Sequence, residues 1–250
     1  MKSGVIKEIL MLLFLYVLCT SCSRTVKDVD GNVYHTVKIG KQVWMKENLR
    51  TTHYADGTEI ASWEFAKTMA PWRYCPNEDY SNVNTFGYLY NWSAVMHAGA
   101  ERNSSSGNVK GICPDGWHVP SKSEFDELVA YCEKLSERKK TYSTCSALAA
   151  PDGWEWTPTE YSPAKPKTDN ASGFSAVPAG EAYYNDKSLH YDYFGRNANF
   201  WGIKSNEEME CILLELDYIG EYSYKSGNVT IREGIDKSES CGYSVRCVKD

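Results

Sequence analysis

The clearest pattern of apolar and polar positions in the chain is helical and follows Pro120. Apolar side chains recur at offsets 0, 3, 4, 7 and 10 from Phe125, which places them on one face of a helix. The preceding residues fit a capping box, in which the Ser121 hydroxyl accepts a hydrogen bond from the Glu124 amide and the Glu124 side chain reaches back. The pattern predicts a helix from Ser121 to about Ser136 that packs its apolar face against a sheet.

Short alternating or apolar runs bounded by turn residues predict β-strands elsewhere. Residues 33–45 alternate on either side of Gly40, which predicts a β-hairpin with a tight turn at that glycine. Further strands are predicted at 172–180, 199–203, 211–216 and 243–248. A long ordered loop, with a short helical piece as an option, is predicted at 62–86, an exposed loop at 100–109, and a further loop rich in Pro, Trp and Thr at 151–168.

These elements together indicate an α+β fold, with one well-capped helix, short antiparallel strands and long ordered loops. The sequence contains no internal repeat and no linker that would divide it. We therefore predict a single domain over residues 29–250.

The first residues are typical of an export signal. An apolar run over residues 9–18 has the length of a signal-peptide core and is too short to span a bilayer as a helix. Residues 20–22 resemble the processing site of bacterial lipoproteins. We predict a signal peptide at 1–21, lipidation of Cys22 and a tether at 22–28, so that acyl chains hold the protein on a membrane. Simple secretion, after ordinary cleavage near the same place, is the alternative.

Composition and charge exclude two classes of protein. The chain has 250 residues, of which 42% are hydrophobic, so it is too apolar to be disordered throughout. Its 27 basic and 33 acidic side chains give a net charge of −6, and we find no basic patch. A nucleic-acid partner is therefore not expected, because such binding depends on Lys and Arg neutralising phosphates.

The cysteines and histidines do not suggest a zinc site. Without Cys19 and Cys22 the chain has seven cysteines, so at least one is outside any internal disulfide. An oxidising compartment permits disulfides, but spacing alone leaves their pairing open. The sequence has no CxxC pair, and its five histidines are scattered.

Two segments are candidates for binding. Residues 183–194 combine aromatic rings with Asn and Asp between two predicted strands, and rings on a loop stack well on sugars or partner surfaces. The alternative is a hairpin whose inner face is aromatic. Residues 74–82 cluster oxygen donors of the kind that Ca²⁺ prefers, although such runs are usually solvated loops, so a metal stays an open question. The candidate ligand-binding residues are Tyr183, Tyr184, His190, Tyr191 and Tyr193.

Six phrases, taken together and in order, resemble the Fibrobacter succinogenes major paralogous domain of secreted and lipoprotein-type bacterial proteins. They span nearly the whole mature chain and lie at 37–49, 86–92, 113–121, 173–180, 199–201 and 244–248. This family looks like a relative of the C-type-lectin-like fold that also underlies formylglycine-generating enzymes. The resemblance implies a C-type-lectin-like single domain and a disulfide between Cys113 and Cys247. Cys211 with Cys241, and Cys132 with Cys145, are weaker pairings of the same kind.

The resemblance also suggests an enzymatic alternative. The oxidase activity of formylglycine-generating enzymes depends on paired copper-binding cysteines in a short Arg/Tyr-rich motif, which residues 241–247 do not match. We also find no HExxH, P-loop, Gly-x-Gly-x-x-Gly or Gly-x-Ser-x-Gly pattern, so no catalytic residue and no cofactor is predicted.

The sequence thus favours a non-enzymatic lipoprotein of the bacterial cell envelope, at the outer membrane or the cell surface. We expect its long loops to bind an extracellular glycan or protein. The alternatives are an oxidoreductase-type enzyme on the formylglycine-generating scaffold and a passive structural component of an envelope assembly.

Overall fold

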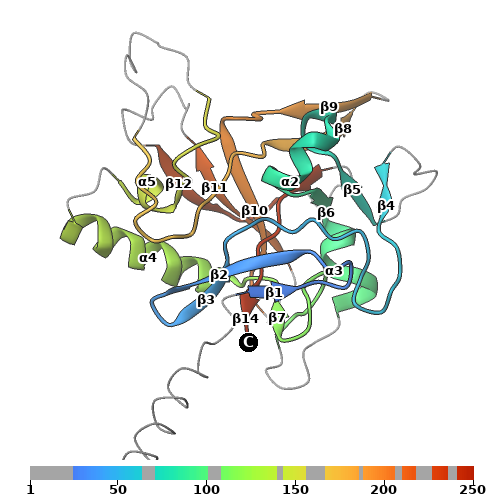
Figure 1. Ribbon diagram of the computed structural model, residues 1–250, viewed down its shortest axis with the longest axis horizontal. Coiled ribbons are helices and arrows are strands. Elements are labelled where there is room, and N and C mark those ends of the chain that lie inside the picture. The colour runs from blue at the N-terminus through green and yellow to red at the C-terminus, as the bar shows by residue number, and fades with distance from the viewer. Residues whose placement is uncertain are drawn as a thin grey trace, which may run out of the picture.

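The computed structural model describes most of the chain from residue 25 onward and is largely β (Figure 1). The described residues are 25–63, 71–100, 108–139, 143–155, 167–185, 188–205, 210–217, 227–235 and 241–250. Within them, fourteen strands form three sheets. The predicted α+β, C-type-lectin-like domain with one helix is therefore wrong. Local patterns identified several strands, but strand pairing joins residues far apart in the chain, and this is what builds a mostly β molecule.

The first sheet carries both ends of the described chain. Its strand order is β1-β2-β3-β14-β7, and all its pairings are antiparallel. The hairpin predicted at 33–45 is confirmed, because β2 and β3 pair around Gly40, whose φ of 60° suits glycine. The strands are β1 (Thr25–Lys27), β2 (Val33–Ile39), β3 (Gln42–Met45), β14 (Val248–Lys249) and β7 (Trp117–His118).

The second sheet has six strands in the order β4-β5-β6-β13-β8-β9. Its β8–β9 edge is a hairpin, and its β4–β5 pair is parallel. The strands are β4 (Ala61–Ser62), β5 (Trp72–Tyr74), β6 (Leu89–Asn91), β13 (Cys241–Tyr243), β8 (Glu181–Asn185) and β9 (Ser188–Asp192). Short helices flank β5 and β6: η2 (Pro76–Glu78), η3 (Tyr80–Asn82), α2 (Val83–Phe86) and α3 (Trp92–Ala100).

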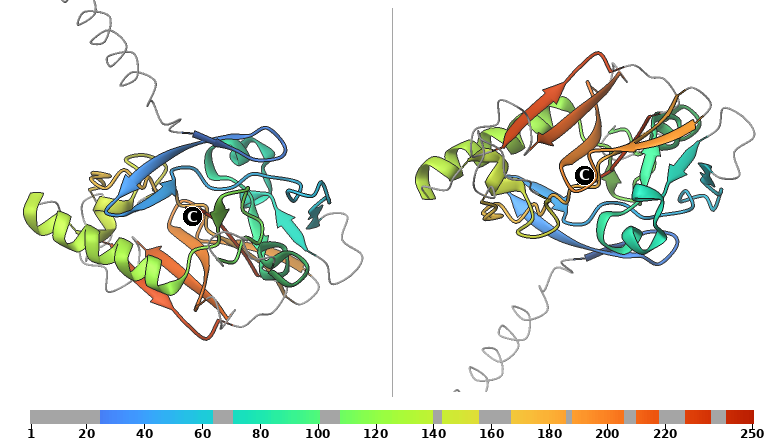
Figure 2. Two further views of the ribbon diagram at one scale, coloured as in Figure 1. Left: turned by 90° about the horizontal axis from the view of Figure 1, so that it is seen from below. Right: turned by 90° about the horizontal axis from the view of Figure 1, so that it is seen from above.

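The third sheet has one apolar face and a second face that is polar at one end and apolar at the other, where Trp201, Ile203, Cys211 and Leu213 are buried. Its strands β10 (Asn197–Ile203), β11 (Cys211–Asp217) and β12 (Asn228–Arg232) pair antiparallel, so every second residue points to the same side. The apolar side packs on the helices α4 (Lys122–Lys139) and α5 (Thr144–Leu148), as Figures 1 and 2 show. The buried residues of that side are Ala198, Phe200, Ile212, Leu214 and Leu216.

The predicted capping box is confirmed at the start of α4. The Ser121 amide donates to Glu124 Oε2 at 2.8 Å, and the Glu124 amide donates to Ser121 Oγ at 3.4 Å. The helix continues to Lys139, past the predicted end near Ser136. Glu124 Oε1 also lies 2.7 Å from Nε2 of the buried His118, whose Nδ1 lies 2.8 Å from Asp250 Oδ1. The cap thus anchors the helix to the C-terminal residue.

Other predicted strands have mixed outcomes. The predictions at 199–203 and 211–216 correspond to β10 and β11, whereas 243–248 divides between the end of β13 and the start of β14. Residues 172–180 form no regular strand, and their β-type pairing is limited to isolated bridges at Ala176 and Gly180. Ser175 has a φ of 60°, which interrupts the extended backbone there.

A buried arginine ties the C-terminal segment to two distant loops. Arg246 is 1% exposed, and its guanidinium donates to the carbonyls of Phe174 and Ser175 and to Asn48 Oδ1. Its carbon Cζ also lies 4.6 Å from the centre of the Phe174 ring and 5.1 Å from that of Phe200. Burial lowers the pKa of Arg246 to about 9, so the group keeps its charge at neutral pH.

The disulfide that the family resemblance implied is present between Cys113 and Cys247, whose Cα atoms lie 6.0 Å apart across 134 residues of sequence. The two weaker pairings are wrong: neither joins its two cysteines in a disulfide.

Candidate functional site

A groove opens where the second and third sheets meet. The two sheets join through β10, because Ala198 bridges Gly180 and Phe200 bridges Ser244. The groove beside this junction has a volume of about 480 Å³, within the range of small-molecule sites. We call it the inter-sheet groove. It is lined by Glu181 and Tyr243 of the second sheet, by Asn197, Glu215, Asp217 and Arg232 of the third, and by Tyr193 and Arg196 of the turn between them.

The alternation of the strands explains why the groove is polar. Asn197 lies opposite Asp217 and Asn199 opposite Glu215, so these four side chains share the face that α4 does not cover. Arg232 lies on the neighbouring strand, and its Nε forms an ion pair of 3.0 Å with Glu215 Oε2. The polar floor therefore occupies one end of this face, which continues into the buried Trp201 and Leu213 at its other end.

Glu181 is the carboxylate most affected by its surroundings. Burial raises its pKa above the ordinary value, and the nearby Asp192 and Glu215 act in the same direction. Arg232 and a hydrogen bond with Tyr243 act in the opposite direction but do not cancel the rise. The side chain therefore holds a proton more readily than an exposed glutamate does.

Asn199 contacts Glu181 but does not line the groove, and it is almost completely buried, with 1% of its surface exposed. Its Nδ2 donates to Glu181 Oε2 at 3.4 Å. Its Oδ1 accepts no hydrogen bond from any described residue. Buried acceptors are normally paired, so this oxygen is an exception within the described core.

Tyr193 stands at the rim of the groove in an unusual backbone conformation. Its φ is 57°, which is costly for a residue with a bulky side chain. The Tyr193 carbonyl accepts hydrogen bonds from the amides of Arg196 and Asn197, at 2.9 and 3.0 Å, and these hold the turn. The side chain remains 52% exposed. The fold therefore keeps an aromatic ring on the surface beside a polar groove.

The hairpin β8–β9 separates the residues that the sequence grouped as a binding loop. Tyr183 and His190 pair across the strands and stack with ring centres 5.2 Å apart, while the Tyr183 hydroxyl donates to Asp192 Oδ2 at 3.0 Å. Tyr184 and Tyr191 point to the opposite face. Of the five predicted residues, Tyr193 alone lines the inter-sheet groove.

Tyr191 lines a second hollow of about 500 Å³ on that opposite face, together with Trp63, Tyr74 and Leu189. The Trp63 ring packs against Tyr184 at 4.7 Å and against Tyr74 at 5.9 Å. These rings pack the hairpin on β5. This agrees with the alternative prediction for residues 183–194, a hairpin whose inner face is aromatic.

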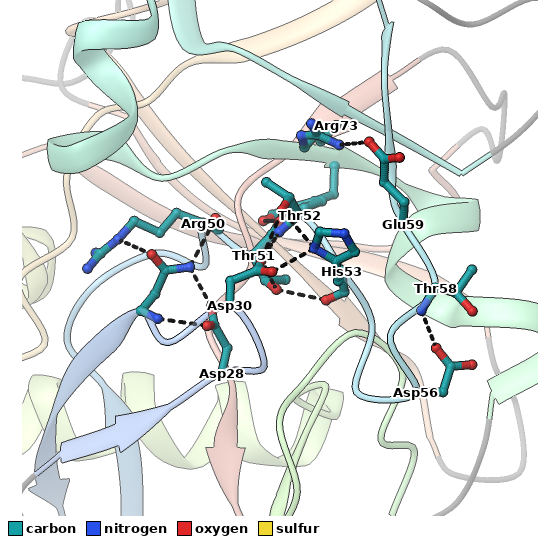
Figure 3. A network of polar contacts seen from close by, with 12 residues as sticks. Asp28, Asp30, Arg50, Thr51, Thr52, His53, Asp56, Thr58, Glu59 and Arg73 are labelled. Atoms are coloured by element: carbon teal, nitrogen blue, oxygen red, sulfur yellow. Dashed lines mark hydrogen bonds and ion pairs between the residues drawn. The ribbon is translucent and has the colours of Figure 1, made fainter.

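A polar network joins the turn at 28–32 to the segment at 50–53 (Figure 3). Asp30 Oδ1 lies 2.6 Å from His53 Nδ1, and its Oδ2 accepts hydrogen bonds from the Thr51 hydroxyl and the Thr52 amide. Burial acts to raise the pKa of Asp30, but the hydrogen bonds outweigh it and lower the pKa to about 2. The Thr52 hydroxyl contacts the same His53 Nδ1. In a catalytic triad the carboxylate and the hydroxyl contact opposite nitrogens of the histidine ring. Here both contact Nδ1, so the cluster does not have triad geometry. We assign it a structural role, in which it holds the turn together.

Comparison with known families assigns the chain to one of them. The family model of the Fibrobacter succinogenes major domain matches residues 37–249. The chain belongs to this family. No curated protein and no solved structure matches the chain. The groove residues of this Fibrobacter succinogenes major domain lie outside the six phrases that carried the resemblance, so membership does not indicate what the groove holds.

The structure also bears on the metal and copper hypotheses for this family member. In the described residues, no group of three or more His, Cys, Asp or Glu side chains could hold a metal ion. In the segment proposed for Ca²⁺, Asp79 caps η3 by accepting from the Ser81 amide at 2.8 Å. Cys247 forms the disulfide with Cys113, so it is not a thiolate ligand for copper.

The predicted signal peptide at 1–21 and the lipidation site Cys22 lie outside the described residues. Part of the segment predicted as a tether at 22–28 is instead a strand, because Thr25–Lys27 form β1. In the described part of the chain, no helix combines the length and apolar character needed to cross a membrane.

Proposed function

We propose that the protein is a non-enzymatic, lipid-anchored protein of the bacterial cell envelope that binds an extracellular glycan in the inter-sheet groove. The main support is the groove itself, with its polar floor and the exposed ring of Tyr193. Sugars offer hydroxyls to planar polar side chains and apolar ring faces to aromatic rings.

The position of the groove agrees with such a role. Cys22 precedes β1 by only two residues, which span at most about 10 Å from Cys22 to Thr25. Figure 1 shows β1 and the C-terminus on the lower side of the molecule and the β8–β9 hairpin on the upper side. An anchor on Cys22 would hold the lower side near the membrane and direct the groove side away from it.

The binding proposal is tested with the full-length protein, purified in detergent, on a glycan array, followed by calorimetry on each glycan that binds. Replacement of Tyr193 by Ala is expected to weaken binding at least about tenfold, which corresponds to about 1.4 kcal/mol. The matched control is Tyr80→Ala, since Tyr80 is 51% exposed and does not line the groove. Equal affinity of both variants, or no glycan bound at all, would contradict the proposal.

The anchor is tested separately by mass spectrometry of protein extracted from bacterial membranes. The expected product begins at Cys22 and carries acyl chains. A soluble protein with an intact Met1 would refute the anchor without affecting the groove.

A further inference from the structure

We propose that the protein forms a two-fold dimer, in which β12 of one copy pairs antiparallel with β12 of a second copy. The two three-stranded sheets then become one continuous sheet of six strands. This inference concerns the edge of the third sheet, and it does not depend on what the inter-sheet groove binds.

β12 is an outer strand of the third sheet and has an open edge. Among the described residues, its backbone pairs only with β11, in an unbroken register from Asn228 to Arg232. Figure 2 shows this orange-red strand at the outer margin of the molecule. The N–H and C=O groups along such an edge are a template for a further strand, because they can form a second ladder of hydrogen bonds.

The sequence of β12 does not protect this edge. Natural edge strands are usually blocked by Pro, Lys, a bulge or a very short length. β12 has five residues, with no Pro, Lys or acidic residue and no bulge in its register. Its central residues Val229, Thr230 and Ile231 are all β-branched, which suits a pleated surface. Its composition therefore favours the addition of a strand.

The other outer strands of the described sheets offer less. β1, β4 and β7 have only two or three residues each, and β10 is bridged to Gly180 and Ser244. β9 is as long as β12, but it lies against η2, and the two elements line the second hollow together. The helices beside β12 instead cover its apolar face, which leaves its edge open.

A two-fold axis at Thr230 gives a register that uses the whole of β12. Thr230 then lies opposite Thr230 of the second copy. Val229 lies opposite Ile231 of the second copy, on the side that faces the helices. Both side chains are only partly buried at the margin of the core. The pairing therefore lets two β-branched apolar side chains cover each other.

The charges on the other face are complementary in the same register. Arg232 lies opposite Asn228 of the second copy, and Asp217 of that copy follows in the same row, because Asp217 pairs with Asn228 within each sheet. The Arg232 side chain is 45% exposed and long enough to extend toward that carboxylate. The two Glu215 side chains are three strand spacings apart, about 14 Å, where like charges are largely screened.

This strand is complementary to its own sequence, so the occupant that the register selects is a second copy of the chain. Two-fold dimers are also the commonest oligomers of soluble proteins. In a continuous sheet, side chains that lie opposite each other point to the same face. The dimer therefore presents both inter-sheet grooves on the same side.

The two-fold register is tested by exchanging charges at Thr230, whose side chain is exposed. Sedimentation equilibrium of the full-length protein in detergent is expected to give twice the mass of one chain. Thr230→Lys and Thr230→Glu, each measured alone, are expected to be monomeric, because the axis places two like charges directly opposite each other. An equimolar mixture of the two variants should regain the dimer mass, because Lys then faces Glu. The matched control is His190→Lys, a change at the exposed centre of β9, which should stay dimeric.

A second measurement uses oxidative cross-linking in intact cells that express the full chain. Thr230→Cys is expected to form a disulfide-linked dimer, because the Cβ atoms of directly opposed residues lie about 4.5–5.5 Å apart. His190→Cys is the matched control, and the unsubstituted protein gives the background from its native thiols.

Each of these measurements can overturn the dimer. An unsubstituted protein that stays monomeric at high micromolar concentration refutes it. If Thr230→Lys is still dimeric, or if the mixture stays monomeric although circular dichroism shows both variants to be folded, the pairing through β12 is wrong. Equal cross-linking of the two cysteine variants contradicts the register as well. None of these outcomes affects the glycan array, so the proposed function is tested separately.

Discussion

The buried Arg246 offers the most direct test of how this fold holds together. We consider the variant Arg246→Met, which retains an unbranched side chain of similar length but removes the charge and all donors. The native guanidinium serves three buried acceptors: the carbonyls of Phe174 and Ser175 and the Asn48 side chain. In the variant these acceptors remain buried and lose their donor.

The expected loss follows from those three contacts. A buried acceptor left without a partner costs about 1–3 kcal/mol, so three of them cost at least about 3 kcal/mol. The variant no longer buries a charge, which offsets part of the loss. It also loses the contacts of the guanidinium with the rings of Phe174 and Phe200. We therefore expect the free energy of unfolding to fall by about 3 kcal/mol.

Urea denaturation of the two proteins measures this difference, with the disulfide verified by non-reducing electrophoresis. The matched control is Arg232→Met, because Arg232 is exposed and makes an ion pair with Glu215. Exposed ion pairs contribute little, so the control should lose less than about 1 kcal/mol. If Arg246→Met also loses less than about 1 kcal/mol of unfolding free energy, the three buried hydrogen bonds of Arg246 do not stabilise the fold as proposed.

Two further predictions concern the other ties at the C-terminus. Replacing both Cys113 and Cys247 by Ser opens a loop of 134 residues. In the chain-entropy model this is expected to lower the free energy of unfolding by about 4 kcal/mol. Urea denaturation measures the change, and an unchanged midpoint would contradict the prediction. Burial acts to lower the pKa of His118, but Glu124 and Asp250 outweigh it and raise the pKa above 6.5. The stabilisation from protonated His118 is therefore fully present below pH 6.5 and is lost as the pH rises through the raised pKa. The stability difference between native protein and His118→Gln should shrink from pH 6.5 upward, and a difference that grows with pH would refute this.

Local features of the sequence predicted local structure well. The capping box at Ser121, the apolar face that follows it and the turn at Gly40 each depend on residues within a few positions of one another. The strand prediction at 172–180 was wrong because Ser175 has a positive φ and its carbonyl accepts from the distant Arg246, and the local sequence shows neither feature. The disulfide came from the family resemblance, since cysteine spacing left its pairing open.

The binding residues were predicted less well, for a geometric reason. The aromatic segment at 183–194 was predicted as a binding loop. Its strands place neighbouring rings on opposite faces, so of the five predicted residues only Tyr193 lines the inter-sheet groove. The alternating polar positions of 197–199, 215–217 and 228–232 were a usable signal for a polar patch on one face of a sheet.

The sequence by itself determined the helix, the first hairpin, several strands, the polar alternation and the assignment to a family, because each of these is a property of neighbouring residues or of recognisable phrases. The tertiary structure alone decided that the strands form three sheets and that a groove lies between two of them. Glu181 and Glu215 meet there because β10 joins both sheets. The physical reason is that strand pairing brings together side chains that are far apart in the sequence. Their burial and the charges around them therefore cannot be read from neighbouring residues.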